Sequence, residues 1–231
     1  EHAADLKAAL ARGEPRRALA GKTLAMIFEK PSLRTRCTFE IGMAQLGGHA
    51  VYLGPQEIGL GRRESIHDVA RNLERWFDLA LARTFVQATV DDLCRYCHIP
   101  VINALSDLDH PCQALADFLT LQEKAGGKSG DLGGFNLTYI GDGNNICHAL
   151  MVIGARLGVN VTVCAPAGYE PDEAFVRAAR QAEAAGGGRL RLERDPRAAI
   201  RAAQAIYTDV WASMGQEQEA AERAAVFQPY Q

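Results

Sequence analysis

The chain has 231 residues, of which 48% are hydrophobic and 23% charged, a composition typical of a globular protein. Its formal net charge of −3 gives no general reason to expect nucleic acid or an anionic membrane as a partner. No apolar run approaches the ~20 residues of a membrane-spanning helix, and the first residues do not resemble a signal peptide. We therefore expect a cytoplasmic protein in which any anion site is local.

Strand-like and helix-like segments alternate along the chain. The expected strands are short and mostly apolar: Lys22–Phe28, Ala50–Leu53, Leu79–Arg83, Pro100–Asn103, Leu137–Ile140, Val159–Cys164, Arg189–Leu192 and Ala205–Tyr207. The expected helices are amphipathic: Thr35–Leu46, Ile66–Arg75, Val90–Cys97, Pro111–Lys124, Asn144–Leu157, Asp172–Ala185 and Pro196–Ala203. Alternation of this kind is typical of parallel sheets with helices on both faces, an α/β fold.

One Gly-rich stretch, Ala125–Gly134, divides these segments into two sets of similar size. We therefore predict two domains, residues 1–125 and 126–231. In open α/β sheets, ligands bind at the carboxyl ends of the strands. Four polar clusters of this sequence follow expected strands, and these clusters are the candidate functional residues.

The first cluster, Phe28–Arg36, joins an apolar strand to a helix. Ser32 suits the N-cap, and free N–H groups at a helix start bind anions. Arg34 and Arg36 add guanidinium groups that match phosphate oxygens. A solvated basic first turn is the alternative, but cations disfavour a helix N-terminus. We interpret the cluster as a phosphate site, although it is neither a Walker motif nor a dinucleotide motif.

The second cluster, Asp107–Gln113, again precedes a helix, with Pro111 suited to its first position. A lone histidine is usually structural. His110, however, lies at a strand end beside a helix start, where the helix dipole favours the neutral, hydrogen-bonding imidazole. We therefore interpret His110 and Gln113 as functional.

The third and fourth clusters follow later strands. Gly141–Asn145 lacks the glycine spacing of a dinucleotide-binding turn and offers two asparagines instead, although a loop with Asx-turns explains them equally. Thr208–Gly215 contains Asp209, a carboxylate that suits an ammonium group. A helix-capping role for Asp209 is an equal alternative.

Six cysteines are scattered without a framework spacing. Cys94 and Cys97 form a C-x-x-C, but no second pair completes a zinc site. We interpret all six as ordinary reduced thiols, and we expect no metal.

Several motifs in register resemble the transcarbamylase family. The shared carbamoyl-phosphate half is suggested by the Ser-x-Arg-Thr-Arg run at 32–36, Ala-Arg-Thr at 82–84 and His-Pro-x-Gln at 110–113. Gly-Asp-Gly-Asn-Asn at 141–145 and Asp-x-Trp-x-Ser-Met-Gly at 209–215 resemble its ornithine branch. The resemblance implies an α/β fold of two domains, each a parallel sheet flanked by helices, with the active site in the cleft between them.

The resemblance also implies a reaction and its residues. The carbamoyl group of carbamoyl phosphate would pass to the δ-amine of L-ornithine, without a metal or organic cofactor. The phosphate would be bound by Ser32, Leu33, Arg34 and Thr35. The carbamoyl end would be held by Arg83, His110 and Gln113 with Thr35, and the catalytic Arg83 and His110 would polarise its carbonyl oxygen. Ornithine would be bound by Asn145, Asp209, Ser213 and Met214.

The implied partners are the two small substrates and copies of this chain in a homotrimer or a multiple of trimers, with no nucleic acid and no membrane. The loop Gln56–Arg63 would reach into a neighbouring subunit's site. Leu33 departs from the family pattern, where a hydroxylated residue is usual, but a backbone contact would survive. The resemblance also implies an earlier start of the first helix, and a His-Cys-Leu-Pro segment and closing helix after Gln231.

Three alternatives remain open. Aspartate carbamoyltransferase shares the first half, but its dianionic acceptor does not suit Asp209. Transcarbamylases for putrescine or acylated ornithine share the reaction. A non-catalytic phosphate-binding regulator would need the phosphate site but not His110, Gln113 and Asp209. The sequence does not distinguish arginine synthesis from arginine breakdown.

Overall fold

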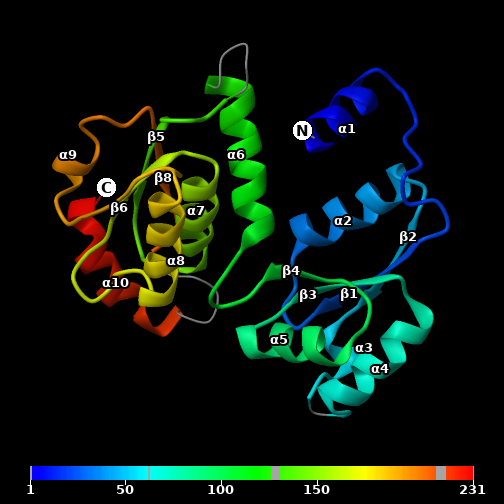
Figure 1. Ribbon diagram of the computed structural model, residues 1–231. Coiled ribbons are helices and arrows are strands. Elements are labelled where there is room, and N and C mark those ends of the chain that lie inside the picture. Colours follow the sequence, from blue (N-terminus) through cyan, green and yellow to red (C-terminus); the bar gives the residue numbers. More distant parts are fainter. Residues whose placement is uncertain (1, 62, 126–130, 212–216, 231) are drawn as a thin grey trace. The chain divides into compact units, whose positions relative to one another are not determined.

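The computed structural model describes residues 2–61, 63–125, 131–211 and 217–230 (Figure 1). The chain forms two compact units, Glu1–Leu108 (unit 1) and Asp109–Gln231 (unit 2), and each is described by itself. No helix among the described residues is long and apolar enough to cross a lipid bilayer.

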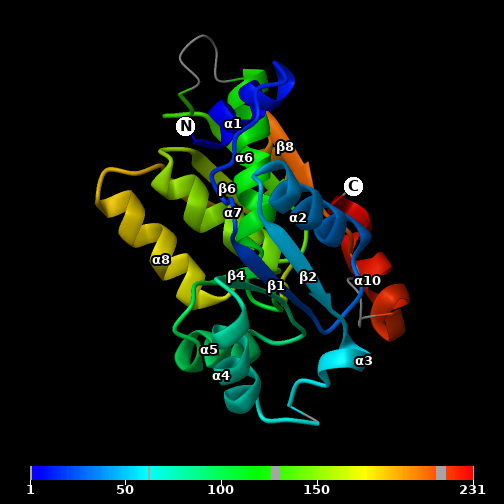
Figure 2. The ribbon, with the colours of Figure 1, turned by 90° about the vertical axis from the view of Figure 1, so that its right-hand side faces the viewer.

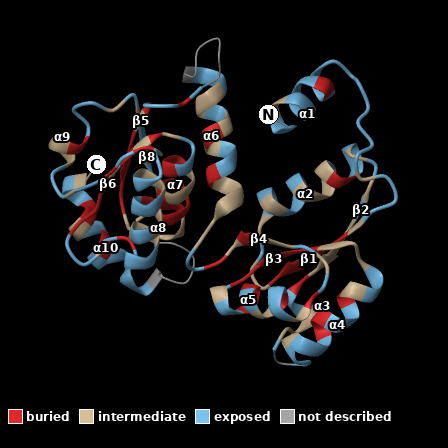
Figure 3. Cartoon of the chain, in the orientation of Figure 1, coloured by how far each residue is buried: buried red, intermediate tan, exposed pale blue. Residues whose placement is uncertain are grey.

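Unit 1 contains a parallel four-stranded sheet in the order β2-β1-β3-β4. Its strands are β1 (Thr23–Phe28), β2 (His49–Leu53), β3 (Leu79–Arg83) and β4 (Val101–Leu105). Strand β1 is central and almost wholly buried, which explains why it reads as a continuous apolar run (Figure 3). Phe28 pairs with Arg83 in the register of β1 and β3, so both strands end at the same edge of the sheet.

Helices cover both faces of this sheet (Figure 2). The helices of unit 1 are α1 (His2–Ala11), α2 (Leu33–Gln45), α3 (Pro55–Ile58), α4 (Ile66–Trp76) and α5 (Gln87–Tyr96); α2 packs on one face of the sheet, and α4 and α5 pack on the other. Side chains alternate along a strand, so Leu24 and Met26 pack towards Met43 of α2. Ala25 and Ile27 face the opposite way, towards the buried residues of α4 and α5. The two faces of β1 therefore hold two separate hydrophobic cores.

Unit 2 contains a second parallel four-stranded sheet, in the order β7-β6-β5-β8. Its strands are β5 (Asn136–Ile140), β6 (Asn160–Cys164), β7 (Leu190–Glu193) and β8 (Ala205–Thr208). Its helices are α6 (Pro111–Ala125), α7 (Asn145–Arg156), α8 (Glu173–Ala184), α9 (Pro196–Ala199) and α10 (Ala220–Phe227), with short 3-10 turns η2 (Glu217–Glu219) and η3 (Gln228–Tyr230). Helices α6, α7 and α8 contribute to the main core, whereas Ala199 of α9 packs in a smaller cluster around Ile140.

The predicted strands are all present, and the fold is the predicted α/β fold of two parallel sheets with flanking helices. The predicted helix Pro196–Ala203 is wrong in length, because α9 ends at Ala199. The chain must then reach Gln204, whose amide already donates to the Asn136 carbonyl at the start of the β5–β8 pairing. Helices α1, α3 and α10 lie outside the helices predicted from the amphipathic pattern.

The compact units divide before α6, at Leu108, because Ala114 and Phe118 of that helix pack into the core of unit 2. The boundary predicted from the Gly-rich stretch lies after α6, at Ala125. That domain boundary stays a prediction.

Candidate active site

The predicted phosphate site lies where β1 ends and α2 begins. Ser32 is the N-cap of α2: its Oγ accepts a hydrogen bond from the Thr35 amide at 3.3 Å and donates one to Thr35 Oγ1 at 3.0 Å. The N–H groups of a first helical turn have no acceptor within the helix and carry the positive end of its dipole. Leu33 is 79% exposed, so any contribution it makes to anion binding falls to its amide.

Arg83, at the end of β3, faces this helix start. It is only 6% exposed, and its Nη1 donates to Thr35 Oγ1 at 3.5 Å. Strand β4 carries an extra residue opposite the Ala82–Arg83 step, a bulge of the kind that redirects side chains near functional sites. Among the described residues, the buried Arg83 Nε has no hydrogen-bond partner. A buried donor without an acceptor is costly, and a bound anion or carbonyl oxygen would remove that cost.

Several cations converge on the same edge of the sheet. Burial, and then the charge of Arg34, lower the pKa of Arg83 below its usual value. The pKa of Lys30 is also lowered, first by burial and then by the charge of Arg83. Like charges held together at a helix N-terminus destabilise one another. An anionic ligand is the natural compensation, so the geometry supports the predicted phosphate site.

Arg36 does not contribute to this cationic group in the way the sequence suggested. Its Nε donates to Glu40 Oε1 at 3.0 Å, one helical turn along α2. Its guanidinium lies 4.0 Å from the centre of the Tyr52 ring. Two local partners therefore already hold the side chain, and we correct the hypothesis that Arg36 is a second phosphate-binding fork.

In unit 2, His110 and Gln113 lie at the start of α6. The His110 carbonyl accepts hydrogen bonds from the amides of Gln113 at 3.1 Å and Ala114 at 3.3 Å, which places the histidine directly before the helix. Gln113 lies in the first turn, and its Nε2 donates to Asp117 Oδ1 at 2.9 Å. The predicted carbamoyl-binding pair is thus local to one helix start, as expected.

The residues predicted to bind ornithine lie where β5 and β8 end next to each other. Ile140 pairs with Thr208, so the loops that follow these two strands meet. Asn144 caps α7 by accepting from the amides of Ile146 and Cys147, and its Nδ2 donates to Asp209 Oδ2 at 2.9 Å. Asn145 is the first residue of α7. The structure therefore brings the Asn144–Asn145 turn to Asp209, whereas the predicted Ser213 and Met214 lie outside the described residues.

Arg223, a residue that sequence reasoning missed, links the loop after β5 to the loop after β8. Arg223 of α10 is 7% exposed, and its Nη1 donates to Asp142 Oδ2 at 2.7 Å and to the Trp211 carbonyl at 3.1 Å. Its Nε donates to Glu219 at 3.0 Å. Gly143, in the same turn, has no room for a side chain, because a Cβ there would lie 2.2 Å from the Pro171 nitrogen. The turn before Asn144 is therefore fixed on both sides.

Two family models match the chain: "Aspartate/ornithine carbamoyltransferase, carbamoyl-P binding domain" over residues 1–123, and the "Asp/Orn binding domain" of the same enzymes over residues 133–231. The ornithine carbamoyltransferase of Pyrococcus horikoshii is 53% identical over 219 residues, which are 95% of this chain and 68% of that protein. The solved structure of the Pyrococcus furiosus ornithine carbamoyltransferase superposes with a TM-score of 0.93 at 52% identity, covering 99% of this chain and 72% of that one.

The chain belongs to the aspartate/ornithine carbamoyltransferase family. Similarity also extends to bacterial members: the ornithine carbamoyltransferase of Anoxybacillus flavithermus is 52% identical over 229 residues, 99% of this chain and 72% of that protein. The carbamoyl-phosphate half of the carbamoyltransferase family includes residues 1–123, and thus His110 and Gln113, although both lie in compact unit 2.

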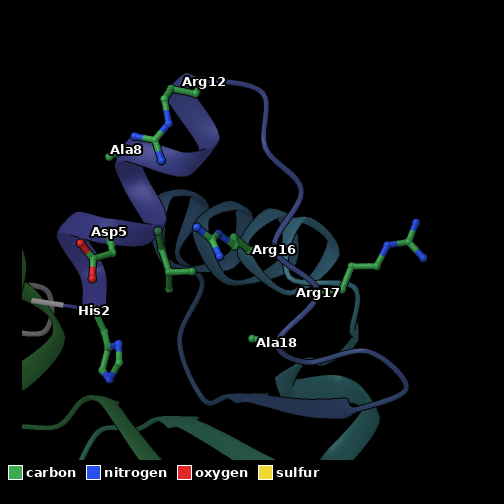
Figure 4. Close-up of a pocket in the computed structure, with 8 residues that line it drawn as sticks. His2, Asp5, Ala8, Arg12, Arg16, Arg17 and Ala18 are labelled. Carbon is green, nitrogen blue, oxygen red and sulfur yellow. The ribbon is translucent and has the colours of Figure 1, made fainter.

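One cavity of this carbamoyltransferase lies apart from the predicted residues. It has a volume of about 530 Å³ and is lined by α1 and the segment that follows it, including His2, Asp5, Arg12 and Arg16 (Figure 4). Arg12 is engaged with Glu14 through Nε at 2.8 Å. None of the predicted site residues lines this cavity, so we do not include it in the candidate active site.

Sequence reasoning missed Arg223, and it gave no separate role to Lys30 or Asn144, although both lie in its candidate clusters. Lys30 carries a readable signal, because it is a cation at a strand end directly before Pro31 and Ser32. The amphipathic pattern makes Asn144 the first residue of the expected helix, whereas the structure makes it the N-cap. Arg223 has no local signal, since its partners Asp142 and Trp211 are distant from it in sequence.

Proposed function

We propose that this carbamoyltransferase transfers the carbamoyl group of carbamoyl phosphate to the δ-amine of L-ornithine, giving L-citrulline and phosphate. The family includes aspartate and ornithine enzymes, and the observation that decides between them here is Asp209. The Asn144 hydrogen bond holds this carboxylate beside the start of α7. A carboxylate attracts the α-ammonium of ornithine and repels the second carboxylate of aspartate. Citrulline formation from the two substrates tests the proposal.

The proposed reaction asks the protein for positioning and charge stabilisation rather than covalent catalysis. The neutral δ-amine attacks the carbonyl carbon, and negative charge develops on the carbonyl oxygen. Arg83 and His110 stabilise this oxyanion. The carbon–oxygen bond to phosphate then breaks, and the proton lost by the amine ends on the released phosphate. Every atom and electron is accounted for by the two substrates, so the reaction needs no redox or group-carrying cofactor.

The substrate-binding roles follow the same chemistry. Ser32, the Leu33 amide, Arg34 and Thr35 bind the phosphate, and Gln113 binds the carbamoyl group. Asn145 and Asp209 bind the α-carboxylate and α-ammonium of ornithine, with Ser213 and Met214 in the same subsite. The first turn of α2 supports the phosphate set. Arg83 Nε, which has no hydrogen-bond partner in the described part of the chain, supports the role of Arg83 at the carbonyl oxygen. The contact of Asn144 with Asp209 supports the ornithine set.

Arg34→Ala should raise the KM for carbamoyl phosphate about ten- to a hundredfold and weaken inhibition by phosphate, because a hydrogen bond to a charged group contributes roughly 1.5–3 kcal/mol. Steady-state kinetics with saturating ornithine measure both effects. Arg36→Ala is the matched control on the same helix, since Glu40 and Tyr52 engage that side chain. Equal effects of the two substitutions, or none, would remove Arg34 from the site.

We further propose that the protein is a cytoplasmic homotrimer or a multiple of trimers, with the segment Gln56–Arg63 contributing to a neighbouring subunit's site. Part of this segment lies in α3 (Pro55–Ile58). The six cysteines are all free thiols, which supports a reducing compartment. A molar mass in solution that is not a multiple of three chains would contradict the assembly.

A further inference from the structure

The amide of Gln113 is held in one orientation by a carboxylate on its own helix. Asp117 lies one turn along α6, and its Oδ1 accepts from Gln113 Nε2 at 2.9 Å. A side-chain amide has a donor end and an acceptor end, which exchange when the group turns over. An ionised carboxylate only accepts hydrogen bonds, so it selects the orientation in which the NH₂ group faces Asp117. The Gln113 carbonyl oxygen then points away from Asp117.

Asp117 is itself fixed against the sheet. Tyr207 of β8 lies close enough to the Asp117 carboxyl to lower its pKa, and the Tyr207 ring stacks on Tyr139 with 5.9 Å between the ring centres. Burial raises the pKa of Asp117, whereas the hydrogen bond from Gln113 and the nearby Tyr207 side chain lower it; the nearby charge of Asp209 raises it. The carboxyl therefore lies at a defined place between α6 and β8, close to the proposed ornithine residues.

The donors and acceptors of carbamoyl phosphate show why the orientation matters. Its phosphate oxygens and carbonyl oxygen accept hydrogen bonds, and Arg34 and Arg83 supply donors for them. Its only N–H donors at neutral pH are those of the carbamoyl NH₂ group. An acceptor is needed there, and the carbonyl oxygen of Gln113 is one.

We propose that Asp117 is a positioning residue that turns the Gln113 amide so that its carbonyl oxygen receives the NH₂ group of carbamoyl phosphate. This inference rests on the proposed function. The competing explanation is a purely local helix contact, since a Gln–Asp pair four residues apart stabilises a helix slightly. The two explanations differ in what the substitution changes: substrate affinity in the first case, and thermal stability alone in the second.

Asp117→Asn keeps the size of the side chain but offers Gln113 either an oxygen or a nitrogen, so both amide orientations become possible. We expect the KM for carbamoyl phosphate to rise about two- to tenfold, as for the loss of one neutral hydrogen bond, with little change in the KM for ornithine or in Tm. Tyr207→Phe, which keeps the ring stacking, should give a smaller rise. Glu123→Gln makes the same chemical change at an exposed position of the same helix and should leave the KM values for both substrates unchanged.

The decisive comparison is a double-mutant cycle in the complete protein. If Asp117 acts through Gln113, then Asp117→Asn should add no further rise in KM once Gln113 is already alanine. Additive effects, or an Asp117→Asn KM within twofold of wild type while Gln113→Ala is impaired, would overturn the inference alone. Should Asp117→Asn fail to fold, Tyr207→Phe replaces it in the double-mutant cycle with Gln113→Ala, and the same non-additive rise in the KM for carbamoyl phosphate is expected. A wild-type enzyme that forms no citrulline would overturn the proposed function and this inference with it.

Discussion

Arg83→Ala should lower kcat for citrulline formation by about two to three orders of magnitude. Removing one donor from a developing oxyanion typically has an effect of this size. The Arg83 side chain is almost fully buried beside Thr35 and the first turn of α2, so water does not readily replace it. Because the effect arises in the transition state, kcat and kcat/KM for carbamoyl phosphate should both fall. Steady-state kinetics with both substrates varied measure this directly.

The same substitution should not destabilise the unliganded protein. Burial and Arg34 lower the pKa of Arg83, which means that the folded protein disfavours this charge in the absence of a ligand. Removing the charge relieves that penalty, so Tm without ligand should stay level or rise. Added phosphate should raise the Tm of wild type and of Arg36→Ala, but much less that of Arg34→Ala. A kcat for Arg83→Ala above one tenth of wild type, or equal losses in Arg36→Ala, would contradict the role of Arg83.

Asp209→Asn should raise the KM for ornithine about ten- to a hundredfold while leaving the KM for carbamoyl phosphate nearly unchanged. The substitution removes a charge-assisted contact to the α-ammonium, and such contacts contribute roughly 1.5–3 kcal/mol. The asparagine still offers an oxygen to Asn144, so the loop geometry should survive. Asp172→Asn is a matched control in the same unit, because aspartate and asparagine are equally good N-caps for α8.

The pH dependence separates binding by Asp209 from proton abstraction by it. The δ-amine of free ornithine titrates near the lysine value of ~10.4, so only a small fraction is nucleophilic at neutral pH. The rate at subsaturating ornithine should therefore rise from neutral to alkaline pH. This rise should persist in Asp209→Asn, since the titrating group belongs to the substrate. Its disappearance would make Asp209 a general base, and equal loss of affinity for both substrates would make it structural.

Much of the fold was predictable because buried parallel strands are continuous apolar runs and the intervening helices are amphipathic. The candidate residues were predictable for a related reason: the carboxyl ends of parallel strands meet at one edge, so Phe28 and Arg83 lie together although they are distant in sequence. Ser32 as an N-cap was confirmed, since capping depends on a local pattern.

The contacts that the sequence did not predict depend on register and on side-chain direction. Arg36 lies near Arg34 in the sequence, but its side chain contacts Glu40 one helical turn on and Tyr52 on β2. Arg223 contacts Asp142 because the fold brings α10 next to the turn after β5, 81 residues earlier in the chain. No local pattern encodes such a pairing. The predicted length of α9 was also wrong. The helix ends at Ala199 because the chain must extend to pair β8 with β5.

Product analysis with a set of acceptors tests the account most directly. The complete purified protein would be incubated with carbamoyl phosphate and either L-ornithine, L-aspartate, putrescine or N-acetylornithine. The carbamoylated product is the quantity to measure, because carbamoyl phosphate also releases phosphate on its own. We expect citrulline from ornithine, with far lower turnover of the other three acceptors. Comparable carbamoylation of putrescine or aspartate, or no citrulline at all, would contradict the proposed function.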